Sequence, residues 1–407
     1  MTIGLAASLG ACSLDRSGTA LDLRSTGQGG AAQQGVGGAS LIAVTANSSS
    51  AAQGGGSSSS GSGGDASAWL GSFGHRKLVT IAATDVVTTL WDFVIPVVRT
   101  DPDLASGAQA DGDDIVFAML DGTTRLAHEL VRFNDQSGAL VAWVKLPHLI
   151  ANDDTLFYMY YGDAYVEDIS STQTWSADYR SVWHMEEDPS LGTKGDVKDS
   201  TATANHLSPK GNFESTDLWD GIIGYSIDID VGNNSYLETV KNVGIKEAQP
   251  RTVSMWVLPN DNPDEGGFGR SLICWGPANQ NSQANFLYYN SDEQTFELGY
   301  WGNDGQTPGN FPKDKWYHVA TTYDGGTDRI YVDGVEVTSR AVGVIDTTDD
   351  KAQIGLDTFG QGRYLNARVD EVHLAYAARS AGWIATEYRS QHDSGAFLSF
   401  GPEQDAP

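Results

Sequence analysis

Apolar and polar residues alternate in short runs along most of the chain after residue 68. In the first part, runs such as RKLVTIAA, WDFVIPVV and DTLFYMYYG are separated by polar clusters such as DGDD and NDQSG. Alternation with a period of two, punctuated by turn residues, is typical of antiparallel β-strands. Pro96 stands inside one apolar run, and its missing N–H restricts such a strand to a sheet edge or a bulge. We therefore expect a small antiparallel β domain over residues 69–168.

The same pattern continues over residues 169–403, with many aromatic residues. Strand-length runs include RTVSMWVLP, NFLYYN, KWYHVATTYDG and ARVDEVHLAYAARS. Asp333 and Gly334 separate two apolar runs, which favours a two-residue hairpin. Only SAGWIATEYRSQ has helical spacing, and we expect it to pack Trp383 on a sheet in a structural role. The predicted fold class is all-β.

Two sets of spaced motifs resemble bacterial extracellular families. The stretch from Phe73 to Asp163 contains HRKLVTI, DGDDIVF, LAHELVRFN, AWVKLP and FYMYYGDA, and it resembles domain of unknown function 2341. The stretch from Trp175 to about Pro402 contains VSMWV, KWYHVATTYDG, RIYVDG and VDEVHL. It resembles the laminin-G-like, or concanavalin-A-like lectin/glucanase, jelly roll in its bacterial laminin-G third family form.

The second resemblance implies a two-sheet jelly roll that follows the small β-sandwich. Its apolar faces should pack inward. The residues expected to line the inner face are Trp256, Trp316, Val319, Ile330, Val332, Val372 and Leu374.

Residues 1–68 have a different composition. Residues 1–12 are mostly apolar, and Leu9 to Cys12 (LGAC) resemble the lipobox of bacterial lipoproteins, which implies lipidation of Cys12. The basic n-region of a secretory signal is missing, so a chance Cys is the alternative. Residues 13–68 are rich in Gly, Ser, Ala and Gln, and they predict a disordered tether because they cannot bury enough apolar area. The expected location is the bacterial cell envelope, on its outer surface or outside the cell, with a lipid anchor as the only membrane contact.

Charge excludes one class of partner. Lys and Arg total 25 against 53 Asp and Glu, a net charge of -28. Such a field repels phosphate backbones, so we expect no nucleic-acid partner. The 2 cysteines are too few for a disulfide framework or a multi-cysteine zinc site.

The usual nucleophile and transition-metal motifs are missing from the sequence. There is no G-x-S-x-G segment, and Cys274 lies among apolar residues, as a small core residue does. The 8 histidines form no H-x-x-x-H pair. His184, His318 and His373 lie in strand-like runs, and we expect them to be hydrogen-bonded structural residues with no zinc.

A catalytic pair of carboxylates would indicate an enzyme, because glycosidases and lyases also use this fold. Asp228 and Asp230 share one face of a predicted strand, but Ser and Asn stand where laminarinase-type jelly rolls have Glu. Asp370 and Glu371 are adjacent, so we expect them on opposite faces. The sequence therefore assigns no catalytic residue, although an enzyme is not excluded.

Calcium is the cofactor that the jelly-roll resemblance implies. Asp199, Asp370 and Glu371 are the candidate ligands, with Glu186 as a further one, because calcium prefers several hard oxygen ligands. The alternative is that these carboxylates accept backbone amides at strand ends and that the acidic excess is a solvated surface.

Aromatic residues in Asn-, Gln- and Gly-rich loops suggest a carbohydrate site, since sugars stack on flat rings while polar groups take the hydroxyls. We expect at least half of these aromatics to be core residues. The candidates are Trp275, Tyr288, Tyr289, Tyr300 and Trp301.

Together these features predict a non-catalytic surface or secreted protein that binds carbohydrate, or a partner protein, through its jelly roll. One alternative is a polysaccharide hydrolase or lyase on the same fold. The other is a structural spacer of the cell envelope with no small ligand.

Overall fold

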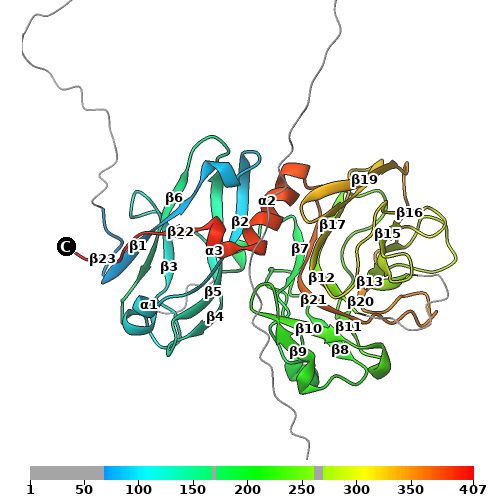
Figure 1. Ribbon diagram of the computed structural model, residues 1–407, viewed down its shortest axis with the longest axis horizontal. Helices are drawn as coiled ribbons and strands as arrows, with labels where there is room; N and C mark the ends of the chain where they lie inside the picture. The colour runs from blue at the N-terminus through cyan, green and yellow to red at the C-terminus, as the bar shows by residue number, and fades with distance from the viewer. Residues whose placement is uncertain (1–67, 167–170, 261–268) are drawn as a thin grey trace, which may run out of the picture. The chain divides into compact units, whose positions relative to one another are not determined.

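The computed structural model describes residues 68–166, 171–260 and 269–407, which all belong to one unit of the chain (Figure 1). Cys12 and the predicted tether up to residue 67 lie outside the described residues. Over the described ranges, no helix is long and apolar enough to span a membrane.

The first domain is a sandwich of two antiparallel sheets. One sheet has the order β22 (Ser399–Phe400), β1 (His75–Ile81), β6 (Thr155–Tyr161), β3 (Val116–Met119), with β23 (Gln404–Asp405) also paired to β1. The other has the order β2 (Leu90–Thr100), β5 (Ala139–Leu149), β4 (His128–Asn134), and helix α1 (Pro102–Gly107) follows β2. Pro96 lies on the edge strand β2, which confirms the expectation from its missing N–H.

The last residues of the chain belong to this first sandwich. Thr80 of β1 pairs with Ser399 of β22, and His75 pairs with Asp405 of β23, as the red C-terminal segment beside β1 in Figure 1 illustrates. The predicted jelly-roll segment 169–403 therefore contributes β22 to the other domain. The first sandwich is built from both ends of the folded chain.

The second domain is the predicted jelly roll. Its first sheet has eight strands, ordered β19 (Val335–Ala341), β18 (Thr327–Val332), β17 (Tyr317–Tyr323), β12 (Arg251–Pro259), β21 (Ala367–Ala375), β10 (Tyr225–Ile229) and β9 (Leu218–Asp220), with β7 (Tyr179–Trp183) also paired to β21. Its second sheet has seven, ordered β16 (Asp304–Gln306), β15 (Thr295–Gly299), β14 (Asn285–Asn290), β13 (Arg270–Trp275), β20 (Gln353–Ile354), β11 (Tyr236–Thr239) and β8 (Leu207–Lys210). Asp333 and Gly334 form the predicted hairpin, both at positive φ.

Alternation along the strands decides which side chains fill the jelly-roll core. The predicted inner-face residues Val319, Ile330, Val332, Val372 and Leu374 all lie in it. The prediction for Trp256 and Trp316 was wrong. Val253, Met255 and Val257 take the inward positions of β12, so Trp256 points outward and donates its indole N–H to Gln391 at 2.7 Å. Trp316 precedes β17 and is half-buried outside the core cluster.

Helix α2 (Ala381–His392) joins the two domains. Ser380 caps its N-terminus, and the short helix α3 (Ser394–Phe397) follows it. Trp383 packs edge-on against Phe93 of the first domain at 4.8 Å between ring centroids, which confirms that it packs on a sheet. The same side of the helix, one and two turns further on, contributes Glu387 and Gln391 to hydrogen bonds with Ser254 and Trp256 of the jelly roll. The helix is thus a buried bridge between the domains.

Candidate functional sites

A pocket of about 210 Å³ lies on the outer face of the seven-stranded sheet. Outward positions of β14 and β15 form its base, and the segments around Trp301 and Phe359 form its walls. Its lining combines four aromatic rings with two carboxylates and one guanidinium: Phe286, Tyr288, Trp301 and Phe359, then Glu297 and Asp304, then Arg363, beside Gly302.

The base of the pocket depends on a glycine. Phe286 and Tyr288 are outward neighbours on β14, with ring centroids 4.5 Å apart. A Cβ on Gly299 of the adjacent strand β15 would lie 2.1 Å from the Phe286 ring. Gly299 therefore leaves the space in which Phe286 lies flat against the sheet.

The walls are held in fixed positions. Asp357 accepts backbone N–H bonds from Phe359 and Arg363, at 3.1 and 3.2 Å, which shapes the segment that carries Phe359. Trp301 has a φ of 63°, a conformation that bulky residues rarely adopt. Its ring meets Phe359 edge-on at 4.8 Å. Strained residues of this kind are concentrated at binding sites.

The charged groups of the pocket are partly desolvated. Glu297 is half-buried and accepts a hydrogen bond from the Asn290 amide at 3.2 Å. Burial raises the pKa of Glu297, and the charges of Glu293 and Asp304 add to this. A carboxylate and a guanidinium facing the same hollow can accept from and donate to hydroxyl groups.

The five predicted carbohydrate-binding aromatics divide between this pocket and the core. Trp301 and Tyr288 line the pocket, but only Trp301 is part-exposed, since Tyr288 is 1% exposed. Trp275 of β13, Tyr289 of β14 and Tyr300 after β15 are at most 1% exposed and lie inside the sandwich. A sugar cannot stack on Tyr288 or on these three, so the prediction was wrong for all but Trp301.

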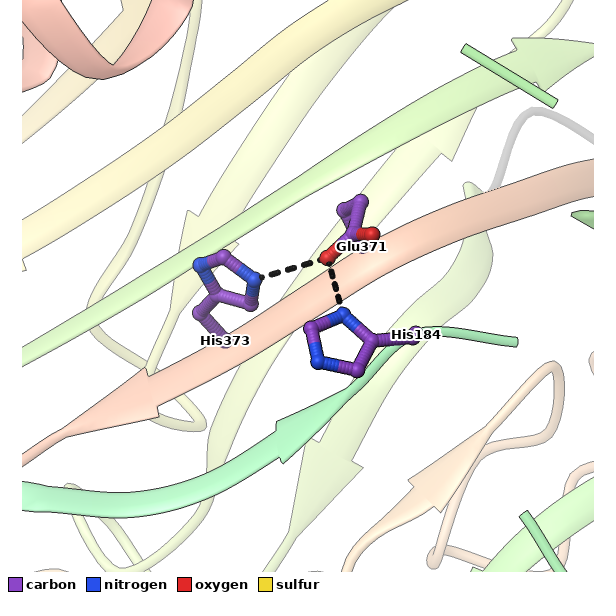
Figure 2. Close-up of side chains that lie close together, drawn as sticks. All are labelled: His184, Glu371 and His373. Carbon is purple, nitrogen blue, oxygen red and sulfur yellow. Dashed lines mark hydrogen bonds and ion pairs between the residues drawn. The ribbon is translucent and has the colours of Figure 1, made fainter. Parts of the chain in front are cut away.

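A second cluster of functional groups is buried on the outer face of the eight-stranded sheet. Oε2 of Glu371 on β21 lies 2.8 Å from Nδ1 of His184 and 3.0 Å from Nε2 of His373 (Figure 2). Both imidazole rings point toward this one carboxylate. Their other ring nitrogens face further carboxylates: Nε2 of His184 lies 3.5 Å from Glu129, and Nδ1 of His373 lies 3.2 Å from Glu387.

A β-bulge brings Glu371 to this position. Ser254 pairs with His373 but Trp256 pairs with Asp370, so one residue of β12 faces two residues of β21. Glu371 has a φ of 46° at the bulge. Asp370 and Glu371 therefore both lie outside the core, between inward-facing valines. The expectation that they point to opposite faces was wrong because regular alternation stops at a bulge.

Aromatic side chains enclose the cluster. Trp143 of β5 stacks on His184 with centroids 5.4 Å apart, and Trp175 and Tyr179 surround His373. The indole N–H of Trp175 donates to Glu129 at 2.6 Å. Since Trp143 and Glu129 belong to the first domain, both domains and α2 contribute to this cluster.

Burial and opposite charge compete at the cluster. Burial would lower the pKa of both histidines, but the surrounding carboxylates raise the pKa of His184 well above its usual range and also raise that of His373. Burial would raise the pKa of Glu371, but the two imidazoles hold it below its ordinary value. Burial, and then the charge of Glu371, raise the pKa of Asp370 well above the usual range.

The predicted calcium ligands have separate surroundings. Asp199 accepts backbone N–H bonds from Val182, Thr201 and Asn205 at 2.7 to 3.0 Å. Asp370 accepts the N–H groups of residues 222 and 223, as the alternative interpretation expected. The helper Glu186 accepts the N–H of Tyr225 at 2.9 Å. Among the described residues, Glu371 converges with histidines rather than with Asp199.

The remaining candidates have structural surroundings. Cys274 is fully buried, and burial raises the pKa of its thiol to about 12, which agrees with a core residue. Asp230 caps a turn by accepting the N–H of Gly232, while Asp228 lies 3.8 Å from Arg368. His318 is buried against Trp256, but neither of its ring nitrogens has a hydrogen-bond partner, so the expectation that it is hydrogen-bonded was wrong.

Sequence reasoning missed the His184–Glu371–His373 cluster, since β7 and β21 are distant in the chain. One local signal was present: Glu371 and His373 are two residues apart on a strand, a spacing that places side chains on one face.

Two family models match the chain. Residues 231–385 match the concanavalin A-like lectin/glucanases superfamily, and residues 111–179 match the domain of unknown function 2341. The chain is thus an all-β protein with a concanavalin A-like jelly roll, and the order of the two matches agrees with the predicted layout. No curated protein matches the chain.

Several solved structures are distantly similar. Domain 4 of AbnA, an extracellular GH43 arabinanase from Geobacillus stearothermophilus solved with arabinotriose, is 17% identical with a TM-score of 0.40, over 51% of this chain and 97% of that chain. The binding domain of Paraclostridial Mosquitocidal Protein 1 is 16% identical with a TM-score of 0.41, over 52% of each chain. A structure of botulinum neurotoxin type C, whose cell entry depends on interaction with two ganglioside molecules, is 12% identical with a TM-score of 0.40, over 54% of this chain and 53% of that chain. The similarity spans about half of each of the latter two chains.

Proposed function

We propose that the protein is a non-catalytic carbohydrate-binding protein that holds a sugar in the aromatic pocket of the seven-stranded sheet. The observation that carries this proposal is the combination in one hollow of the part-exposed rings of Trp301 and Phe359 with Glu297, Asp304 and Arg363. Sugar rings have apolar faces that stack on aromatic rings and hydroxyls that need donors and acceptors.

The size of the pocket favours a small unit. Its volume of about 210 Å³ is below the ~300–1,000 Å³ of pockets for drug-sized ligands, so it suits one sugar residue. A neighbouring hollow of about 250 Å³ shares Glu297 and Asp304 with it. A chain of two or more sugar units could therefore occupy both hollows side by side.

A glycan array with the full chain tests this proposal, run once with calcium and once with chelator. We expect a defined sugar to bind, and Trp301→Ala to weaken its binding about tenfold or more, since a ~1.4 kcal/mol loss corresponds to a factor of ten. Trp91→Ala is the matched control, because Trp91 is 69% exposed on the first domain, outside the pocket. Loss of binding in chelator would support the calcium prediction.

Silence of the folded protein on the array would overturn the carbohydrate proposal, as would unchanged binding by Trp301→Ala. Cleavage of a bound polysaccharide would instead favour the hydrolase or lyase alternative. Circular dichroism of each variant establishes that it is folded.

We also propose that Cys12 carries a lipid that anchors the protein to the bacterial envelope. The LGAC sequence and the following Gly- and Ser-rich stretch support this. Stable anchoring needs more than one acyl chain. Fatty-acid labelling in a bacterial host should mark the wild type and not Cys12→Ser, and an unlabelled wild type would contradict the proposal.

A further inference from the structure

We propose that His184, Glu371 and His373 form a binding site for a transition-metal ion of the zinc type, at the junction of the two domains and α2. This inference does not depend on the carbohydrate proposal, because the cluster lies on the eight-stranded sheet and the pocket lies on the seven-stranded sheet.

The ligand atoms already converge. Nδ1 of His184, Nε2 of His373 and a carboxylate oxygen of Glu371 all lie within 4.8 Å of one another. Atoms that ligate zinc at ~2.0–2.1 Å in a tetrahedron stand about 3.3–3.4 Å apart. The two nitrogens lie 2.8 and 3.0 Å from Oε2 of Glu371. Side-chain shifts of about half an ångström would therefore open room for the ion.

The surroundings of the histidines match those of metal ligands. A metal-bound imidazole usually gives its other N–H to a carboxylate, which fixes the ring and its tautomer. Here the distal nitrogen of His184 faces Glu129 at 3.5 Å, and that of His373 faces Glu387 at 3.2 Å. These two carboxylates are themselves held, Glu129 by Trp175 and Glu387 by Ser254. Of the two contacts, that of His373 is a hydrogen bond, whereas Nε2 of His184 is within ion-pair distance of Glu129 without a hydrogen bond.

One further observation points to a missing ligand. Glu371 is only 1% exposed, and its buried Oε1 has no hydrogen-bond partner. A buried carboxylate oxygen without a partner is costly. A cation bound by both oxygens of Glu371 would satisfy it.

The donor set selects the class of metal. Two imidazole nitrogens with a carboxylate suit zinc, cobalt or iron(II), whereas calcium and magnesium prefer oxygen ligands only. The full burial of all three residues, which all belong to the jelly roll, favours a structural ion.

Reconstitution of the full wild-type chain tests the site directly. The protein is purified without a metal-affinity step, stripped with chelator, incubated with Zn²⁺ or Co²⁺ and desalted. We expect about one retained ion per chain by elemental analysis, and visible cobalt bands of a low-coordinate site. The thermal unfolding midpoint should rise with zinc and fall with chelator. These measurements need no variant, so a variant that fails to fold does not obscure them.

Variants then assign the ion to these residues. Glu371→Gln and His373→Gln should reduce retained metal to below about a tenth of an ion per chain. Glu387→Gln should weaken zinc affinity about 10- to 100-fold, because Glu387 orients the ligand His373 and does not itself bind the ion. The control is His75→Gln, which removes the histidine of the cluster His75, Glu403 and Asp405 and should leave cobalt bands unchanged.

Stripped wild-type protein that retains no zinc or cobalt, with an unfolding midpoint indifferent to both metal and chelator, would overturn the proposal. So would metal that is retained by Glu371→Gln and lost in His75→Gln. Glycan binding by Trp301→Ala and wild type is measured separately, so failure of either proposal is distinguishable from failure of the other.

Discussion

The two outer faces of the jelly roll differ in what covers them. The face of the eight-stranded sheet lies under the first domain and α2, and its polar residues are buried in hydrogen bonds, Glu371 with His373 and Ser254 with Glu387 of α2. The face of the seven-stranded sheet keeps a pocket at Trp301 and Glu297, which are both part-exposed. Alternation places polar and aromatic side chains on the outer face of both sheets. Whether these side chains hydrogen-bond to one another or face a ligand pocket depends on the elements that cover the face.

The largest expected effect of a single change concerns the covered face. Trp143 is 1% exposed and packs on Trp175 and His184 between the domains. Trp143→Ala should lower the free energy of unfolding by about 3–5 kcal/mol, since no neighbour can fill the cavity. Trp301→Ala on the open face should cost far less. Urea denaturation of both variants measures the contrast, and equal losses would show that the faces do not differ in this way.

A smaller effect is expected for Asp199, which lies near the covered face. Its carboxylate accepts three backbone N–H bonds and the Thr201 hydroxyl. Asp199→Ala should lower the free energy of unfolding by about 2–3 kcal/mol, because buried donors lose a charged acceptor. Thermal melts should find this loss equally large in calcium and in chelator. A loss present only with calcium would instead identify Asp199 as a calcium ligand.

The smallest effect concerns the pH dependence of the open face. Burial raises the pKa of Glu297 above its ordinary 4.5, so the folded state holds this proton more tightly than the unfolded chain does. Stability should therefore fall as pH rises from 4.5 through the raised folded pKa, and stay level outside that window. Because Glu297 is half-exposed, the change should be only a few tenths of a kcal/mol.

Glu297→Gln lacks this titration and serves as the matched comparison. The unfolding free energy of the wild type, measured relative to the variant between pH 4 and about 7, should decline. Parallel profiles for the two proteins would mean that Glu297 is as well solvated in the pocket as in the unfolded chain.

Local sequence patterns predicted the strands, the hairpin and the helix better than they predicted which face of a strand points into the core. The run HRKLVTI corresponds to β1 itself, and the Asp333–Gly334 hairpin and α2 lie where their sequence signals place them. These features depend on neighbours in the chain. Trp256 was misplaced because period-two alternation cannot tell which of two faces looks into the core.

The candidate sites depend on long-range pairing, and the sequence predicted them only in part. Tyr288 and Trp301 were found as aromatics near polar loops, but nothing local separates them from Tyr289, which faces inward. The cluster around Glu371 depends on a β-bulge and on His184, which is 187 residues away in the sequence. Neither is encoded in short-range periodicity.

The pairing of β22 with β1 has a consequence for synthesis on the ribosome. Thr80 and Ser399 are 319 residues apart, so at ~5–20 residues per second roughly 15–65 s pass between their translation. During this time the edge of β1 that later pairs with β22 and β23 has unpaired backbone groups, which can pair with other chains. The first domain to be translated is therefore among the last to be completed, and a nascent chain needs protection at that edge until β22 and β23 have left the ribosome.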